Sequence, residues 1–131
     1  MRHLAAHPLV LLVLSCGGSL LTVPSGPPPP DAARVRVEYP PPPAKVEEIS
    51  VGHGGGPCAW RDGFWDWSGR RWEWQPGRAV RPVAGCYHSR PALERSADTL
   101  TFLRPAWYPQ AGGPKSCAEV ACTAAPGTMV N

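Results

Sequence analysis

Cysteine and histidine residues in the middle of the chain are of the types that bind zinc. The set is His53, Cys58, Cys86 and His88. A tetrahedral zinc ion accepts thiolate and imidazole ligands, so a two-cysteine, two-histidine site is one interpretation. Only Cys86 and His88 are closely spaced, and the paired motifs of structural zinc sites are missing. We therefore predict no metal and no cofactor, and keep metal binding as a secondary alternative.

Motifs of catalysis are missing from the sequence. It contains no Gly-rich phosphate loop, no HExxH motif and no GxSxG motif. Ser, His and Asp occur, but their spacing in a Pro- and Gly-rich chain indicates no triad. We predict that the protein is not an enzyme. The net charge is +3 with basic and acidic residues intermixed, whereas nucleic-acid binding needs clustered basic charge, so we expect no nucleic-acid partner.

The N-terminal residues have the composition of an export signal. Arg2 gives a short basic start, and an apolar run follows over residues 9–14. Residues 13–16 resemble the lipobox of bacterial lipoproteins, in which the cysteine is lipidated and becomes the new N-terminus. We therefore predict a signal peptide over residues 1–15 and a lipid anchor on Cys16.

An uncleaved membrane anchor over residues 4–23 is the alternative. Its length is close to the 20 or so residues that a spanning helix needs. The segment contains residues that disfavour such a helix. These are His7, Pro8, Gly17 and Gly18. We rank this anchor second.

The other four cysteines are an even set, which an oxidising compartment would hold as disulfides. They are Cys58, Cys86, Cys117 and Cys122. We predict two bridges, and three pairings are open. Cys117 and Cys122 enclose only four residues, so a short bridge between them is the default expectation.

Proline dominates the part that follows the predicted anchor. Nine of the twenty residues from 24 to 43 are proline, which favours an extended polyproline II spacer. We predict a Pro-rich, disordered tether over residues 16–57. Residues 35–39 alternate like a strand, without a partner that the sequence identifies. At the other end, residues 110–131 are expected to form a frayed tail.

A degenerate 14-residue period fills residues 58–109. Units begin at Cys58, Trp72, Cys86 and Leu100. The third position carries a ring in each unit, and the sixth carries Gly63, Gly77, Pro91 or Pro105. Fixed-period similarity is typical of stacked architectures. The similarity of the last two units is weak enough to be partly chance. A shifted reading frame somewhere past Cys86 is a separate alternative, because Arg, Pro, Ala and Gly richness is typical of such frames in GC-rich genomes.

Alternation of Trp with polar residues predicts a β-hairpin. The rings are Trp65, Trp67, Trp72 and Trp74, which we call the Trp face. Gly69 supplies the positive φ of a tight turn. A four-residue loop would place Trp65 opposite Trp74, whereas a two-residue loop would place it opposite Trp72, and both keep the rings on one face. These rings are either the core of a small sheet or a platform for sugars, and the scarcity of aliphatic residues favours the core.

The motif at residues 72–77 resembles the YXWGXW repeat family of small exported bacterial proteins, and the Pro-rich lead is similar as well. Ala79 departs from the family pattern, as do Cys58 and Cys86 and the ring-poor last two units. The resemblance implies export, lipid attachment and β structure, and it implies no reaction. We therefore expect an all-β domain of about four short antiparallel strands.

The expected function is that of a non-catalytic lipoprotein of the bacterial cell envelope, membrane-anchored and facing the periplasm or exterior, with a structural or surface-interaction role. Its expected partners are the membrane and an envelope glycan or protein. The main alternative is a glycan- or peptidoglycan-binding module that uses the Trp face.

Overall fold

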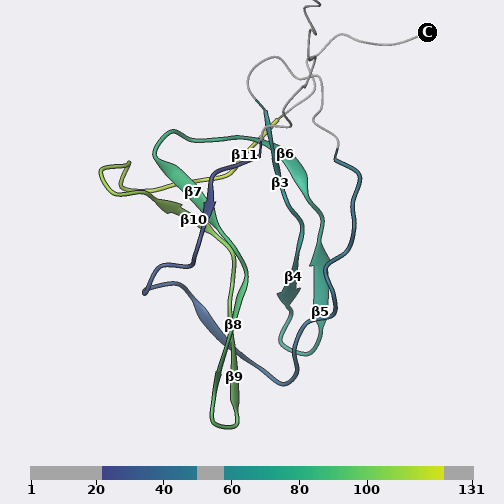
Figure 1. Ribbon diagram of the computed structural model, residues 1–131. Helices are drawn as coiled ribbons and strands as arrows, with labels where there is room; N and C mark the ends of the chain where they lie inside the picture. The colour runs from purple at the N-terminus through teal and green to yellow at the C-terminus, as the bar shows by residue number, and fades with distance from the viewer. Residues whose placement is uncertain (1–21, 50–57, 123–131) are drawn as a thin grey trace, which may run out of the picture.

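Most of the regular structure lies in four segments, each made of two short consecutive strands, which we call arms. The computed structural model describes residues 22–49 and 58–122, and all regular structure in these residues is β (Figure 1). The arms are β3 (Ala59–Arg61) with β4 (Phe64–Trp67), β5 (Trp72–Gln75) with β6 (Arg78–Arg81), β7 (Cys86–Ser89) with β8 (Ala92–Ser96), and β9 (Thr99–Leu103) with β10 (Trp107–Pro109). The all-β prediction is confirmed, with each arm counting as two strands because it is interrupted once.

The interruptions of the four arms are spaced 14 residues apart. They contain the sixth-position residues of the four sequence units, which are Gly63, Gly77, Pro91 and Pro105. Proline has no N–H to donate to a ladder, and glycine has no side chain to pack on a sheet, so both weaken a strand at its middle. The arms therefore bend at equivalent points, which we call the bends.

The first two arms form hairpin A, and its register follows from a four-residue loop. Trp65 lies opposite Trp74, and Trp67 lies opposite Trp72. Gly69, in the loop, has a φ of +98°, as its position in the sequence predicts. Beyond the bend, β3 pairs with β6, so that the arms stay together along their length.

The last two arms form hairpin B, and the Pro-rich segment pairs with it. β2 (Arg34–Val37) lies antiparallel to β9, with Val35 opposite Phe102, and β8 pairs with the other edge of β9. β1 (Ser25–Gly26) lies parallel to β7. Two stretches of the predicted tether, Ser25–Gly26 and Arg34–Val37, are thus strand-paired and are not a free spacer. The alternating residues that follow Arg34 pair with β9, which lies about 65 positions further along the chain. No local sequence pattern indicates this pairing.

The core lies between the Trp face and the β2–β9 sheet. Its buried members are Val37, Trp67, Trp72, Leu100 and Phe102, with Val35 and Trp65 packed against them. Trp72 meets Phe102 edge to face at 4.9 Å between ring centroids. The Arg104 guanidinium adds an ion pair to Asp66 at 2.6 Å, which joins the two hairpins. Leu100 and Phe102 come from the part for which a shifted frame was the alternative, and they belong to the same folded unit as hairpin A.

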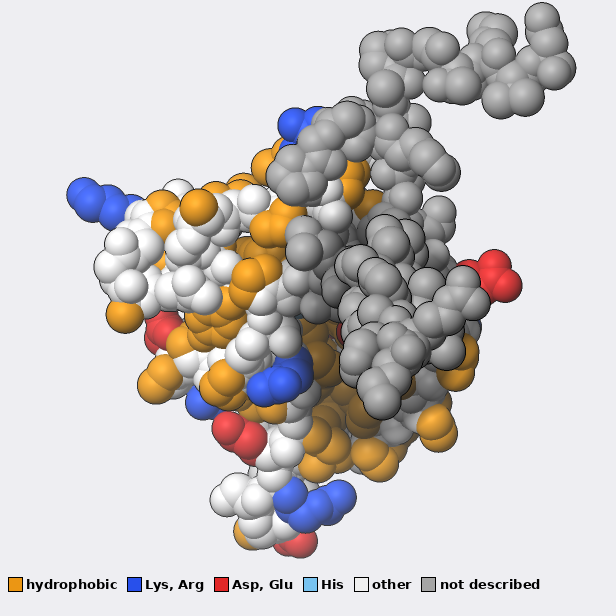
Figure 2. Space-filling model, turned by 45° about the horizontal axis from the view of Figure 1, so that its top comes forward, with side chains coloured by type: hydrophobic (Ala, Val, Ile, Leu, Met, Phe, Trp, Pro, Cys, Tyr) orange, Lys and Arg blue, Asp and Glu red, His pale blue; other side chains and the backbone are white. Residues whose placement is uncertain are grey.

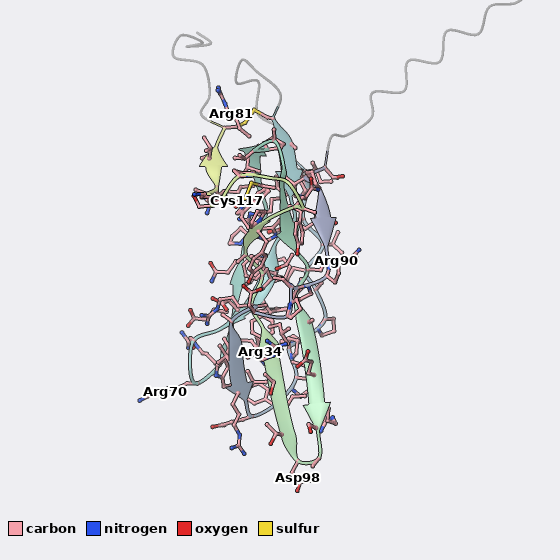
Figure 3. All side chains as sticks on the ribbon, turned by 90° about the vertical axis from the view of Figure 1, so that its left-hand side faces the viewer. Arg34, Arg70, Arg81, Arg90, Asp98 and Cys117 are labelled. Atoms are coloured by element: carbon pink, nitrogen blue, oxygen red, sulfur yellow. A yellow bond between two sulfur atoms is a disulfide. The ribbon has the colours of Figure 1, made fainter. Side chains whose placement is uncertain are left out.

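Two disulfides tie the C-terminal part to the ends of the arms. They join Cys58 to Cys122 and Cys86 to Cys117, so the prediction of two bridges is confirmed and the short Cys117–Cys122 bridge is wrong. The reason is that β11 (Val120–Ala121) runs antiparallel to β6, which carries Cys122 to the start of β3. Residues 110–122 of the predicted tail are therefore held on the domain. Figure 3 shows Cys117 and Asp98 toward opposite ends of an elongated molecule.

Several predictions concern residues outside the described part of the chain. These are the signal peptide, the lipidated Cys16, His53 and most of the alternative anchor at residues 4–23. Within residues 22–49 and 58–122, a search for a helix of sufficient length and hydropathy to cross a bilayer found none.

Candidate functional site

The Trp face is covered by the chain that follows β2. We call residues 38–49 the strap; Figure 1 shows it running beside β5. Trp67 and Trp72 are only 4% and 7% exposed, and Trp65 and Trp74 are half-buried. The structure thus brings the four predicted rings together on one face, where Trp67 and Trp72 are core, Trp65 packs against them and Trp74 lies outside the core cluster.

Backbone carbonyls of the strap accept hydrogen bonds from the indoles. The Nε1–H of Trp72 donates to the Tyr39 carbonyl at 3.0 Å, and that of Trp65 donates to the Pro43 carbonyl at 3.0 Å. An extended Pro-rich chain makes no internal hydrogen bonds, so its carbonyls are free to accept these donors. The indole N–H groups need such acceptors when they are buried. The proline content therefore suits the segment to cover tryptophans.

Glu47 fixes the far end of the strap on the bend of hairpin A. Its Oε1 accepts the Trp74 Nε1–H at 2.8 Å, and its Oε2 accepts the Gly77 N–H at 2.9 Å. The indole hydrogen bond lowers the pKa of Glu47 below its usual value against some desolvation, and the N–H groups of Gly77 and Gly63 add to the effect. A carboxylate is thus held ionised by three converging donors.

The glycines of the bend allow the strap to approach closely. A Cβ on Gly63 would lie 2.6 Å from the Trp74 ring and 2.7 Å from Glu47 Oε2. A Cβ on Gly77 would lie 2.9 Å from the same oxygen and would also meet the Trp60 ring. Each third-position Trp therefore packs over the sixth-position Gly of the opposite arm, which accounts for both residue types in the first two units.

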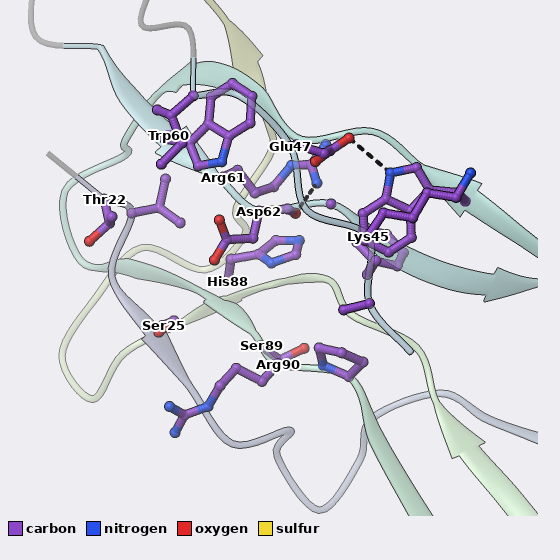
Figure 4. A pocket seen from close by; sticks show the side chains of 17 residues that line it. Thr22, Ser25, Lys45, Glu47, Trp60, Arg61, Asp62, His88, Ser89 and Arg90 are labelled. Carbon is purple, nitrogen blue, oxygen red and sulfur yellow. Dashed lines mark hydrogen bonds between the residues drawn. The ribbon is translucent and has the colours of Figure 1, made fainter. Parts of the chain in front are cut away.

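A groove of about 680 Å³ opens beside the bend. Its walls come from the end of the strap, the bend of hairpin A, the residues around β1 and the bend of hairpin B (Figure 4). Rings of Trp60, Phe64 and Trp74 line it, and the polar side chains of Asp62 and His88 lie between these walls. This volume is within the range of about 300–1,000 Å³ that is usual for small-ligand sites.

An ion-pair network centred on the buried Arg61 borders the groove. Arg61 is 4% exposed, with Nε 2.7 Å from Glu119 Oε2, and Arg78 Nε lies 2.7 Å from Glu119 Oε1. Burial opposes ionisation of Glu119, but the Trp107 indole hydrogen bond and the two guanidinium charges together lower its pKa. The Arg61 Nη1–H donates to the Asp62 carbonyl at 3.0 Å. These contacts bind the tail to hairpin A and compensate the buried charges.

His88 is held uncharged at neutral pH. Burial lowers its pKa from the ordinary value to about 4, and the Arg61 charge contributes in the same direction. Its ring meets Trp107 edge to face at 5.2 Å and lies 6.1 Å from Phe64. A neutral imidazole has one donor and one acceptor nitrogen, so it can serve uncharged polar ligands.

The lowered pKa of His88 predicts a loss of stability in mild acid. Between pH 6.5 and about 4 the unfolded chain binds a proton at this residue that the folded chain does not, so stability falls as the pH falls through this window. Thermal melts of the parent protein should show a midpoint several degrees lower at pH 5 than at pH 7. The melting midpoint of the His88→Gln variant should change less over the same pH range. Glu47 and Glu119, whose pKa values are lowered, should lose their contribution only below about pH 4.5. Equal pH dependence of the melting midpoint in the parent and the His88→Gln variant would contradict the assignment of this loss to His88.

Sequence reasoning and structure differ on the polar residues. His88 belongs to the set of residues considered for the alternative of metal binding, but Cys58 and Cys86 of that set are disulfide-bonded and offer no thiolate. Among the described residues, no group of three or more His, Cys, Asp or Glu could hold a metal. Glu47 and Asp62 were not predicted as site residues. The signal available for Glu47 was a carboxylate near the end of an otherwise Pro-rich segment, which is weak evidence alone.

Comparison with known family models, with curated proteins and with solved structures found no match for this chain.

Proposed function

We propose that the protein is a non-catalytic lipoprotein of a bacterial cell envelope, lipidated on Cys16, with a structural or surface-interaction role. The observation that carries the proposal is the pair of disulfides, Cys58–Cys122 and Cys86–Cys117. Disulfides persist in oxidising, extracytoplasmic compartments, so the bridged domain is compatible with export. Membership of the YXWGXW family is part of the same proposal and rests on the motif at residues 72–77.

The state of the charged groups supports a non-catalytic role. Arg61 and Glu119 are paired with each other, and Glu47 is bound by Trp74 and Gly77. A general acid or base must be able to exchange a proton with a substrate. Groups held this way stabilise the fold, and their altered pKa values follow from structural hydrogen bonds and ion pairs.

The short distance in sequence between Cys16 and the first described residue limits how far the proposed anchor could lie from the domain. Thr22 forms a bridge with Trp60, and the Val23 N–H donates to the Trp60 carbonyl at 3.1 Å. Thr22 is six positions after Cys16 in the sequence, and six extended residues span at most about 20 Å. A lipid on Cys16 would therefore hold the domain near the membrane surface, and the Pro-rich segment would stabilise the domain instead of spacing it from the membrane.

Replacement of Cys16 by serine is expected to release the protein from the membrane fraction. The lipid needs the thiol, and each buried methylene of an acyl chain stabilises membrane insertion by about 0.8 kcal/mol. Fractionation followed by intact-mass measurement checks both location and lipid. The double variant Cys58→Ser, Cys122→Ser is the control, because it removes cysteines without leaving a free thiol and keeps Cys16, so this protein should stay in the membrane fraction. Unchanged membrane retention with an uncut N-terminus would instead support the anchor at residues 4–23.

A further inference from the structure

We propose that the groove binds a neutral oligosaccharide, which packs on the rings of Trp60, Phe64 and Trp74 and forms hydrogen bonds with Asp62 and His88. The inference rests on the proposed function, because an envelope-exposed domain meets polysaccharides, and it gives that function a ligand class. The site shares only Trp74 with the Trp face, because the strap takes up the indole donors of Trp72 and Trp65 through the Tyr39 and Pro43 carbonyls.

Aromatic walls favour a ligand with apolar faces. Trp74 and Phe64 are half-buried, and Trp60, although only 7% exposed, also lines the groove. Sugar rings present C–H groups on their faces and hydroxyls around their edges. An aromatic ring offers a flat apolar surface to the C–H groups of the sugar, while a few polar groups orient the hydroxyls by hydrogen bonds.

Asp62 and His88 suit the hydroxyl groups of a sugar because together they provide hydrogen-bond acceptors and an uncharged donor in the same groove. Asp62 is exposed, and within the described residues its carboxylate has no hydrogen-bond or ion-pair partner. His88 lines the same groove as an uncharged imidazole, which has one donor and one acceptor nitrogen. A hydroxyl is both donor and acceptor, so it can donate to the carboxylate and bond to the imidazole at once.

Charges of both signs line the groove. The cations are Lys45, Arg61 and Arg90, and the carboxylates are Glu47 and Asp62. Arg61 is engaged by Glu119, Lys45 lies over the Trp65 ring, and Glu47 is bound by Trp74 and Gly77. An anion would meet the Asp62 carboxylate between the walls of the groove, so this mixed lining favours an uncharged polar ligand. On the face shown in Figure 2, the Lys and Arg side chains are scattered among hydrophobic and acidic ones.

The test is titration of the full mature chain, carrying Cys16→Ser to keep it soluble, with tetramers of glucose and of N-acetylglucosamine. Intrinsic Trp fluorescence reports on the rings of the groove, and calorimetry gives Kd. Asp62→Asn should weaken binding of the preferred tetramer at least about tenfold, because a hydrogen bond from a hydroxyl to a charged acceptor is lost. Asp98→Asn is the matched control, since this carboxylate is exposed at the far tip of hairpin B. Equal melting midpoints for the two variants establish that both are folded.

Several results would overturn the inference. They are the absence of binding by either tetramer at millimolar concentration, equal affinities of Asp62→Asn and the parent protein, and equal weakening by Asp98→Asn. Displacement of the tetramer by inorganic phosphate would reassign the groove to anions. Membrane fractionation is independent of all of these, so a chain that is lipidated but binds no tetramer would retain the proposed function and lose only its ligand class.

Discussion

Replacement of Trp72 by alanine is expected to destabilise the domain by about 3–5 kcal/mol, the usual cost of deleting a buried aromatic side chain. Trp72 is 7% exposed, meets Phe102 and Trp67 edge to face at 4.9 and 5.2 Å, and donates its indole hydrogen to Tyr39. The variant would lose core contacts and one attachment of the strap together. A small domain has only about 5–15 kcal/mol of stability, so the variant should be largely unfolded or melt far below the parent.

Denaturant unfolding followed by Trp fluorescence measures this loss. The neighbouring Glu73→Ala serves as the control, because its ion pair with Arg71 is solvent-exposed and should contribute less than about 0.5 kcal/mol. A Trp72→Ala protein with the parent's melting curve but weakened adhesion to a glycan would show that the Trp face is a platform and not a core.

Removal of the Cys58–Cys122 bridge is expected to have an effect of similar size. The bridge closes a loop with a sequence separation of 64 residues, for which the loss of unfolded-chain entropy corresponds to about 4 kcal/mol. The double variant Cys58→Ser, Cys122→Ser avoids a free thiol, and it should also weaken the pairing of β11 with β6. Thermal melts compared with the non-reduced parent give the magnitude.

Peptide mapping under alkylating conditions checks the pairing itself. We expect linked peptides that contain Cys58 with Cys122 and Cys86 with Cys117. Recovery of a peptide with Cys117 bonded to Cys122, or of four free thiols, would contradict the position of the tail on hairpin A.

Local sequence patterns predicted hairpin A because its information is local. Alternating Trp residues and Gly69 specify strands, turn and a shared face within a dozen positions. The 14-residue period also located the bends, since Gly63 and Gly77 stand where the arms are interrupted. Loop length alone left two registers open, and the structure has the four-residue loop.

Long-range contacts could not be predicted from the same patterns. Val35 and Phe102 are far apart in sequence, so their pairing depends on how the Trp face and β9 enclose one core. Proline content correctly indicates an extended backbone but not whether an extended segment is free or docked. The docking depends on the indole donors of hairpin A, which are satisfied by Tyr39 and Pro43 carbonyls.

The groove could not be predicted from the sequence for a related reason. Trp60 and Asp62 belong to hairpin A and His88 belongs to hairpin B, so only tertiary packing brings them to one cavity. His88 attracted a metal-binding interpretation because it lies two residues from Cys86. The disulfide to Cys117 removes that thiolate, and burial leaves His88 as a neutral side chain in the groove.

Hydrogen exchange of the indole N–H groups tests most directly the central claim that the strap covers the Trp face. In the mature, oxidised protein, NMR should find the Nε1–H of Trp72 and Trp74 exchanging much more slowly than a free indole, because Tyr39 and Glu47 accept these hydrogens. Glu47→Ala should accelerate exchange at Trp74 more than at Trp72. Free-indole exchange rates at both residues, while the backbone amides of hairpin A remain protected, would mean that the hairpin folds without the strap and would contradict the account.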